Sequence, residues 1–427
     1  GYLKHNMHEV AVFEFFFRKL PQHRNFLVAA GLELVLDYLE TLRFEEEDLR
    51  WLAASGRFDD QLIDYLARFR FTGSVDAIPE GTIVFPDEPL IRVTAPLPQA
   101  QLVETRLINL LNFNTVIASK AIRMVLAAPN KLLVDFGLRR AHGAEAGLLA
   151  ARAAYLAGFA GSATVEAERS FGIPSYGTVA HSFIQAHESE REAFLNFARL
   201  NPENTVLLID TYDTEAAARL VVELAPILAQ ENIAIRAVRL DSGDLGALSK
   251  SVRKIFDEAG LRHIQIFASG GLDEYAIRDL LSRGAPIDGF GIGTSLTTSS
   301  DAPGLDCAYK LQEYAGMARR KRSAGKATWP GRKQVFRRYD ASGRMVGDVI
   351  TVIDDDRTEG EPLLRCVMRD GRRVASDDLD TIRRRVREQT AKLPEDLRTL
   401  DTGVRYPVEI AEALKVLASE VDHRISG

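Results

Sequence analysis

The segment at residues 239–244, Arg-Leu-Asp-Ser-Gly-Asp, places a cation and two carboxylates at the end of a short apolar run. In an extended chain Arg239 and Asp241 point to the same side, because one residue separates them. An aspartate in such a place accepts hydrogen bonds from ribose hydroxyls or holds hydrated Mg²⁺. A buried ion pair that closes a barrel is the alternative. Asp210 and Asp213 follow the preceding apolar run and add two more carboxylates.

Two glycine-rich loops, Ser269-Gly270-Gly271 and Gly293-Thr294, each stand between an apolar run and a helical window. Glycine lets backbone N–H groups approach an anion closely, and the amino end of a helix favours negative charge. Barrel enzymes often bind phosphate at their last two strand-to-helix loops. Tight turns alone would also explain the glycines, but two successive loops favour a phosphate site.

An aromatic ring and guanidinium groups follow the first apolar run, at Phe136 and Arg139. This combination suits a flat anionic ring, because Phe136 can stack on the ring and one of the arginines can bind its carboxylate. A phenylalanine that belongs to the core is the alternative.

Further along, Thr178 is predicted to cap a helix, which would place His181 in its first turn. A phosphorylated imidazole would be stabilised there, whereas a packed or hydrogen-bonded histidine is the simpler interpretation.

Residues 319–338 carry nine lysines and arginines with Ser, Gly and Thr between them. We interpret this run as a mobile anion-binding loop for a polyphosphate, because it follows the two glycine loops in the sequence. A solvated charged face or a nucleic-acid patch is the alternative.

Short apolar runs bounded by turn residues are typical of buried parallel strands. Helical windows lie between them, so the chain alternates strand, loop and helix. We predict an irregular α/β barrel rather than a doubly wound sheet, because no Gly-x-Gly-x-x-Gly fingerprint opens the pattern. The runs begin near residues 132, 206, 237, 266 and 287, and the helical windows cover 143–159, 178–198, 214–229, 246–259 and 273–283.

Both ends of the chain differ from this middle region. Residues 9–20 are rich in strand formers, 81–93 predict a small β-rich segment, and 333–375 predict a meander with Asp-Gly turns. Helices are expected at 25–42, 45–71, 100–127 and within 376–425. We therefore predict three parts: residues 1–128, the barrel at 129–330, and residues 331–427, which pack back on the first part as one α/β sandwich-like domain.

The composition limits the classes of function. Of 427 residues 46% are hydrophobic, which is enough for a packed core, and the net charge of -6 argues against broad nucleic-acid binding. Two cysteines exclude a cysteine-based zinc module and a disulfide framework. We expect no membrane span and no signal peptide, and hence a cytoplasmic protein.

Assembled, these motifs closely resemble the nicotinate phosphoribosyltransferase family over nearly the whole chain. The resemblance rests on Val-Phe-Glu-Phe-Phe at 12–16, Asp-Phe-Gly-Leu-Arg-Arg at 135–140, Gly-Thr-Val-Ala-His-Ser-Phe at 177–183, and the segments at 239–244, 268–273, 290–294 and 325–334. It implies a type II phosphoribosyltransferase fold in a homodimer with shared active sites. It also implies that nicotinate and phosphoribosyl pyrophosphate react, coupled to ATP hydrolysis, to give nicotinate mononucleotide and pyrophosphate.

The resemblance assigns a role to each motif. Phe136 would stack on nicotinate and Arg139 contact its carboxylate, while His181 matches the histidine that ATP phosphorylates. Arg239 and Asp241 would hold the phosphoribosyl group, beside Asp210 and Ser269. The 5′-phosphate would lie on Gly270, Gly271, Gly293 and Thr294, and the pyrophosphate near Lys321, Ser323 and Lys326. Mg²⁺ would bind mainly through the pyrophosphate, with Asp241 as a possible ligand and no other direct protein ligand.

Two positions bear on the alternatives. Relatives that use nicotinamide carry an Asp where this chain has Ala163, which favours nicotinate because an Asp would repel its carboxylate. The family's N-terminal segment, whose tyrosine covers the base in the partner's site, falls before Gly1, and Tyr2 is not its match. A nicotinamide or quinolinate phosphoribosyltransferase, or a catalytically silent nucleotide-binding homologue, are the alternatives.

Overall fold

The computed structural model describes residues 1–355, 359–401 and 403–426. They form two compact units, and each is described by itself. The split unit combines Gly1–Ser119 with Asp301–Gly427, and the barrel unit is Lys120–Ser300. These borders differ from the predicted domain boundaries at 129 and 331, which stay a prediction.

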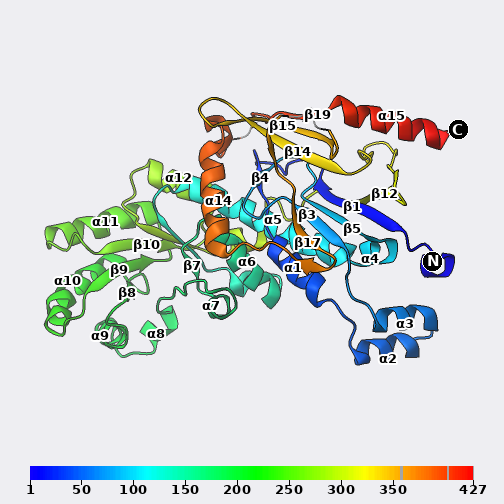
Figure 1. Cartoon of the computed structure of the whole chain (residues 1–427). Helices are drawn as coiled ribbons and strands as arrows, with labels where there is room; N and C mark the ends of the chain where they lie inside the picture. Colours follow the sequence, from blue (N-terminus) through cyan, green and yellow to red (C-terminus); the bar gives the residue numbers. More distant parts are fainter. Residues whose placement is uncertain (356–358, 402, 427) are drawn as a thin grey trace. The chain divides into compact units, whose positions relative to one another are not determined.

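The split unit is built around an antiparallel sheet that takes strands from both ends of the chain (Figure 1). Its strands are β1 (Val10–Phe17), β2 (Leu27–Val28), β3 (Ser74–Ala77), β4 (Ile83–Val84), β5 (Ile91–Pro96), β12 (Cys307–Tyr314), β13 (Met317–Ala318), β14 (Lys333–Tyr339), β15 (Met345–Val352), β16 (Glu361–Pro362), β17 (Arg365–Arg369), β18 (Arg372–Arg373) and β19 (Val408–Ile410). The largest sheet has the order β13-β12-β1-β5-β3-β17-β18. N-terminal strands therefore pair with C-terminal ones, which confirms the predicted domain made from both ends.

Two smaller sheets complete this unit, β16-β14-β15-β19 and β2-β4. The predicted Asp-Gly turn is present between β17 and β18, where Asp370 and Gly371 both have positive φ. The helices of the split unit are η1 (Leu3–His5), α1 (Leu32–Thr41), α2 (Glu46–Ala54), α3 (Asp60–Ala67), α4 (Leu97–Leu102), α14 (Leu379–Lys392), η3 (Glu395–Arg398) and α15 (Glu412–Ser426).

The barrel unit holds one parallel sheet made of β6 (Leu132–Asp135), β7 (Gly161–Ser162), β8 (Thr205–Leu208), β9 (Ile235–Leu240), β10 (Gln265–Ser269) and β11 (Gly289–Ile292). The strands lie in the order β7-β6-β11-β10-β9-β8. Strands that follow one another in the chain are neighbours from β8 to β11, and β11 then pairs directly with β6, which closes the sheet toward a barrel. Pairing of the first long strand with the last one is what a barrel requires. Across the fully described range 120–300, β7 and β8 do not pair, so the barrel is open there.

Helices follow the strands as the alternation predicts. They are η2 (Leu138–Arg140), α6 (Ala144–Ala157), α7 (Val165–Phe171), α8 (His181–Gln185), α9 (Glu190–Leu200), α10 (Thr214–Gln230), α11 (Leu245–Glu258), α12 (Glu274–Ser282) and α13 (Thr294–Thr298). The single helix expected at 178–198 is wrong in one respect. It is divided into α8 and α9, because Ser189 adopts an extended conformation and caps α9 through its side chain.

The helix α5 (Glu104–Ala127) continues from the split unit into the barrel unit. Within the described residues it is the helix long and apolar enough to cross a membrane by composition alone. However, 72% of its most apolar window is buried inside the protein, as is usual for a core helix. Its apolar side chains are thus explained by packing.

Candidate active site at the carboxyl ends of the barrel strands

The aspartates at the ends of β8 and β9 divide into two kinds. Asp213 and Asp244 are helix caps, since their side chains accept hydrogen bonds from the backbone N–H groups of Ala216 and Ala247. Asp273 caps α12 in the same way. Asp213 lies three residues after Asp210, and Asp244 lies three residues after Asp241. In each motif the second aspartate therefore caps the helix, while the first, Asp210 or Asp241, remains at the edge of the sheet.

Arg239 connects these edge residues. Its guanidinium lies 3.1 Å from the Asp241 carboxylate and donates a 3.0 Å hydrogen bond to the Ser269 hydroxyl. Ser269 donates in turn to Asp241. The pair is the one that residue alternation predicts on a single side of β9. Its side chains keep 14% and 24% of their exposure, so it is not sealed in the core and a ligand can reach it.

His181 and Asp210 lie together on the neighbouring strand end. Nε2 of His181 is 3.2 Å from Oδ1 of Asp210, while Oδ2 accepts from the Asp241 N–H and from Ser242. His181 is the first residue of α8, as predicted. The predicted cap was wrong, because Ala180 occupies the cap position and the Thr178 hydroxyl instead accepts a hydrogen bond from Arg239. The charged Arg239 guanidinium is a stronger hydrogen-bond donor than a backbone N–H group, so Thr178 binds Arg239 rather than capping α8.

The two glycine loops lie side by side, since β10 pairs with β11 at Ser269 and Gly291. Gly270 and Gly271 have φ of +98° and +63°, and a Cβ on Gly270 would stand 2.0 Å from the Asp241 carbonyl oxygen. A hydrogen bond from Ser295 to the Leu272 carbonyl joins the loops. Gly270, Gly271 and Thr294 are exposed. The structure thus brings together the residues predicted to bind phosphate and leaves their backbone open.

Alternate glycines on β11 make room for aromatic rings inside the barrel. A Cβ on Gly291 would lie 2.5 Å from the Phe136 ring, and one on Gly289 would lie 2.8 Å from Phe267. The two rings are 6.0 Å apart, and the Arg239 guanidinium lies 5.5 Å from the centre of the Phe136 ring. Sequence reasoning missed this function of the glycines, although their period of two in a strand was the available signal.

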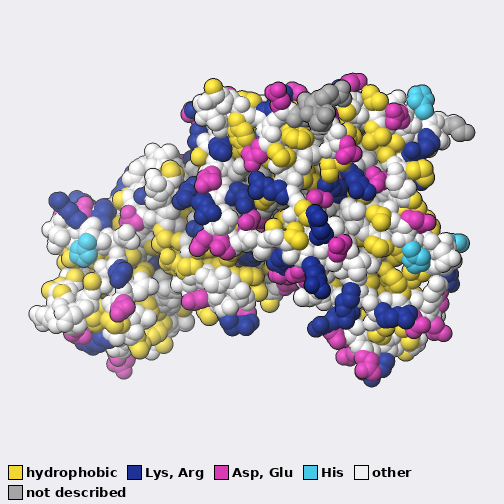
Figure 2. All heavy atoms as spheres, viewed as in Figure 1, with side chains coloured by type: hydrophobic (Ala, Val, Ile, Leu, Met, Phe, Trp, Pro, Cys, Tyr) yellow, Lys and Arg dark blue, Asp and Glu magenta, His cyan; other side chains and the backbone are white. Residues whose placement is uncertain are grey.

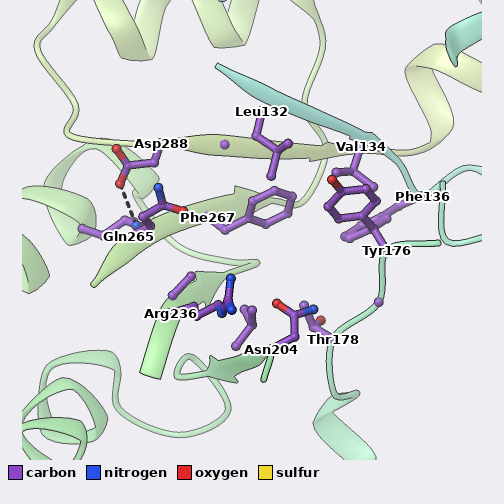
Figure 3. A pocket seen from close by; sticks show the side chains of 15 residues that line it. Leu132, Val134, Phe136, Tyr176, Thr178, Asn204, Arg236, Gln265, Phe267 and Asp288 are labelled. Carbon is purple, nitrogen blue, oxygen red and sulfur yellow. Dashed lines mark hydrogen bonds between the residues drawn. The ribbon is translucent and has the colours of Figure 1, made fainter. Parts of the chain in front are cut away.

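Phe136 and Phe267 line a cavity of about 180 Å³ inside the sheet (Figure 3). Tyr176 and Thr178 lie at the Phe136 end, and Asn204, Arg236 and Gln265 come from the starts of their strands or just before them. A cavity of this size suits one small ring, since an engineered protein cavity of about 150 Å³ binds benzene. Other lining residues are Leu132, Val134, Gly177, Val206, Ala237, Ile266, Asp288 and Gly289.

Asp135 fixes the loop that carries Phe136. It is buried, and its carboxylate accepts hydrogen bonds from the Gly137 N–H at 2.8 Å and from Ser162 at 2.7 Å. Burial raises the pKa of Asp135, while these two hydrogen bonds oppose the rise. Arg139 is exposed on η2 and, in the described structure, is not among the cavity-lining residues. Its predicted contact with a carboxylate stays a prediction.

A buried ionic group supports the helix behind the first glycine loop. Glu274, the first residue of α12, is fully buried and lies 2.7 Å from Lys120 and 2.8 Å from Arg123. Burial alone would raise the pKa of Glu274, but the two cations outweigh it and lower the pKa. Sequence reasoning gave no role to these residues, which are separated by about 150 positions in the chain.

The basic run at 319–338 is less uniform than predicted. Lys333 and Arg337 belong to β14 and are buried against Glu14 and Asp348, and Arg332 pairs with Glu313. Buried cations need such partners, so they are unavailable to a ligand. Lys321, Ser323 and Lys326 are exposed in a turn where the Lys326 N–H donates to the Ser323 carbonyl. Only this part of the run retains the predicted character of an anion-binding loop.

On the face shown in Figure 2, Lys and Arg side chains lie among Asp and Glu side chains. Among the described residues, no group of three or more His, Cys, Asp or Glu side chains is placed to hold a metal ion.

An open α/β barrel with an arginine–aspartate pair and glycine loops at the carboxyl ends of its strands is typical of barrel enzymes, which keep their chemistry at that face. Sequence comparison makes the assignment specific. Models of the nicotinate phosphoribosyltransferase (NAPRTase) N-terminal domain, family region and C-terminal domain match residues 1–112, 132–321 and 356–418. The chain therefore belongs to the nicotinate phosphoribosyltransferase family.

Individual relatives agree with this assignment. The chain is 50% identical over 417 residues to nicotinate phosphoribosyltransferase pncB2 of Mycobacterium tuberculosis, covering 97% of this chain and 89% of the relative. Nicotinate phosphoribosyltransferase of Bacillus subtilis is 40% identical, covering 83% and 74%. The crystal structure of human nicotinic acid phosphoribosyltransferase matches with a TM-score of 0.89 at 27% identity, covering 99% and 97%. The predicted family and fold are thus confirmed.

Proposed function

We propose that this protein transfers the phosphoribosyl group of phosphoribosyl pyrophosphate to nicotinate, releasing nicotinate mononucleotide and pyrophosphate for NAD biosynthesis. The observation that carries the proposal is the order of groups at the carboxyl ends of the strands. Phe136, at one end of the inner cavity, the Arg239–Asp241 pair and the two glycine loops follow one another as the base, ribose and phosphate of a nucleotide do.

The chemistry needs little from the protein beyond position and charge. The pyridine nitrogen attacks the anomeric carbon while the bond to the pyrophosphate oxygen breaks, so no general base is required. In our proposal Phe136 stacks on the base and Arg139 contacts its carboxylate, while Arg239 and Asp241 hold the ribose. The 5′-phosphate lies on Gly270, Gly271, Gly293 and Thr294, and the leaving pyrophosphate is stabilised by Lys321, Ser323 and Lys326.

A magnesium ion fits this arrangement only as a partner of the substrate. Oδ1 of Asp241 already accepts from Ser269 and pairs with Arg239, so the protein offers a single carboxylate oxygen rather than a cage. Mg²⁺ commonly binds through one or two carboxylates together with substrate phosphates. Bound in that way, it would neutralise charge on the pyrophosphate.

We further propose that ATP phosphorylates His181 and that its hydrolysis drives the transfer. The support is geometric, since His181 begins a helix at the sheet edge and Asp210 orients its ring. A carboxylate that holds one ring nitrogen leaves the other to act as nucleophile. The proposal also includes a cytoplasmic homodimer with shared active sites and domain boundaries at 129 and 331.

The direct test is product formation from phosphoribosyl pyrophosphate and nicotinate, nicotinamide or quinolinate, each with and without ATP. We expect nicotinate mononucleotide as the main product and a higher yield with ATP. Ala163, exposed after β7, places no carboxylate near the base and so supports an acidic substrate. Equal or faster use of nicotinamide would contradict the nicotinate assignment, and substrate binding without turnover would favour a silent homologue.

The histidine is tested separately by His181→Ala. Basal transfer should remain, whereas stimulation by ATP and ³²P labelling from γ-labelled ATP should disappear. His187→Ala is the matched control, because His187 lies on the turn after α8 and bonds the Phe183 carbonyl through Nδ1. Label that persists in His181→Ala would place the phosphorylated residue elsewhere without affecting the transferase assignment.

A further inference from the structure

The gap between β7 and β8 is occupied by the segment at residues 174–178. Ser175 forms a parallel bridge with Ser162, whose N–H donates to the Pro174 carbonyl at 3.1 Å. The Tyr176 N–H donates back to the Ser162 carbonyl at 2.9 Å. Two residues on, the Thr178 hydroxyl accepts from Arg239. The segment therefore extends the wall of the barrel beside β7 by backbone pairing.

A glycine determines where the Tyr176 side chain can lie. A Cβ on Gly161 would stand 2.6 and 2.8 Å from two carbons of the Tyr176 ring and 2.1 Å from the Pro174 carbonyl oxygen. Contacts that short force a shift of the ring or of the backbone. The ring is thus packed directly on the backbone of β7, and a larger residue at position 161 would displace it.

Tyr176 and Phe136 line the same end of the cavity, and Phe267 lines its wall (Figure 3). The cavity of about 180 Å³ leaves room for one small ring. A flat ring that enters it from the Phe136 end meets Tyr176. Aromatic faces attract one another, so Tyr176 can contribute binding energy without contributing charge.

We propose that Tyr176 is a binding residue for the nicotinate ring, an aromatic wall supplied by the same chain and positioned by Gly161. This inference rests on the proposed function. It predicts that replacing the ring weakens binding of the base while leaving phosphoribosyl pyrophosphate unaffected. A merely structural residue would not separate the two substrates in this way.

The test compares steady-state kinetics of Tyr176→Met, which keeps an apolar side chain without the ring, with Tyr176→Phe, which keeps the ring. In Tyr176→Met the KM for nicotinate should rise about tenfold, within the range measured when aromatic stacking on a base is removed. The KM for phosphoribosyl pyrophosphate should stay within about twofold, and Tyr176→Phe should restore the nicotinate KM. Tyr212→Met is the matched control, because Tyr212 lies exposed in another strand-end loop of the same unit.

A measurement on the unaltered protein covers the case in which Tyr176→Met does not fold. Nitration of tyrosines by tetranitromethane, followed by peptide mass spectrometry, should slow at Tyr176 when nicotinate is added but not at Tyr212. An unchanged nicotinate KM in folded Tyr176→Met, an equal rise in both KM values, or no protection of Tyr176 would each overturn the inference. If the unaltered protein forms no nicotinate mononucleotide at all, the proposed function fails instead.

Discussion

Two arginine–aspartate pairs in this protein have the same chemistry and opposite surroundings. Arg239 and Asp241 at the edge of the barrel keep 14% and 24% of their side-chain exposure, whereas Arg337 and Asp348 between β14 and β15 keep none. The buried pair is saturated, since Arg337 also donates to Gln389, and Asp348 accepts from Tyr406. Two properties therefore distinguish a ligand site from a structural cluster: how far the pair is buried, and whether its groups can still form hydrogen bonds. The presence of an arginine–aspartate pair alone does not distinguish them.

A second acid, Glu88, lies next to this buried pair. It is fully buried, and burial raises its pKa well above the usual range, with the neighbouring Asp348 carboxylate as the next cause. Burial and the neighbouring carboxylate both favour the protonated form of Glu88, which would add no second negative charge beside Asp348. The edge pair has no such neighbour in its contacts, because Asp210 turns its oxygens to His181, Ser242 and the Asp241 N–H.

The largest effect is expected from Arg337→Ala. Removing the cation leaves Asp348 buried and uncompensated, and breaking such a pair costs about 3–5 kcal/mol. Urea denaturation should show this as a loss in the free energy of unfolding. The control is Arg338→Ala on the same strand, whose partner Glu409 is 60% exposed and whose loss should cost no more than about 1 kcal/mol. Equal effects of the two variants would remove the distinction between the pairs.

Arg239→Ala should reduce activity strongly and stability little, which is the opposite of what is expected for Arg337→Ala. Catalytic efficiency is expected to fall about 10²–10³-fold, the usual cost of one charge-stabilising donor. The free energy of unfolding should change little, because Asp241 remains partly solvated and keeps the Ser269 hydrogen bond. Arg199→Ala, which removes an exposed pair with Glu231, controls for a surface arginine in the same unit. If Arg239→Ala were unfolded at the temperature of the activity assay, the pair at the sheet edge would be structural.

Much of the barrel could be predicted because parallel strands are apolar runs and their loops need glycine and helix caps. The Arg239–Asp241 pair came from the alternation of side chains along a strand. The position of His181 in the first turn of a helix was right, although the cap predicted for that helix, Thr178, was wrong. β7 could not be found, since Gly161 and Ser162 give no apolar signal. The contacts of Glu274 join segments far apart in the chain, which no local pattern contains, whereas the glycines of β11 did carry a local signal in their period of two.

Gly291→Ala tests whether the interior glycines serve the aromatic cavity. The new methyl group would lie 2.5 and 2.6 Å from carbons of the Phe136 ring and would displace it. Overpacking of this kind costs about 1–3 kcal/mol of stability. We expect in addition a rise of about tenfold in the KM for nicotinate as the stacking face moves. Gly304→Ala, with only one atom at 4.0 Å, is the control and should change neither quantity. An unchanged nicotinate KM in folded Gly291→Ala would separate the glycines from base binding.

The smallest step, measured per pH unit, is expected in the pH dependence of the buried cluster. A carboxyl whose pKa is raised on folding stabilises the folded state in its protonated form. That stabilisation is complete below the unfolded pKa of about 4.3 and is lost as the pH rises through the folded pKa. For Glu88 the loss amounts to at most about 1.4 kcal/mol per pH unit.

Glu88→Gln replaces the acid with an amide that also donates to Asp348 and does not ionise. Urea titrations between about pH 5 and pH 8 should therefore show the unaltered protein losing stability relative to Glu88→Gln as the pH rises. Parallel curves for the two proteins would mean that Glu88 is ionised in the folded state and that the cluster carries a net negative charge.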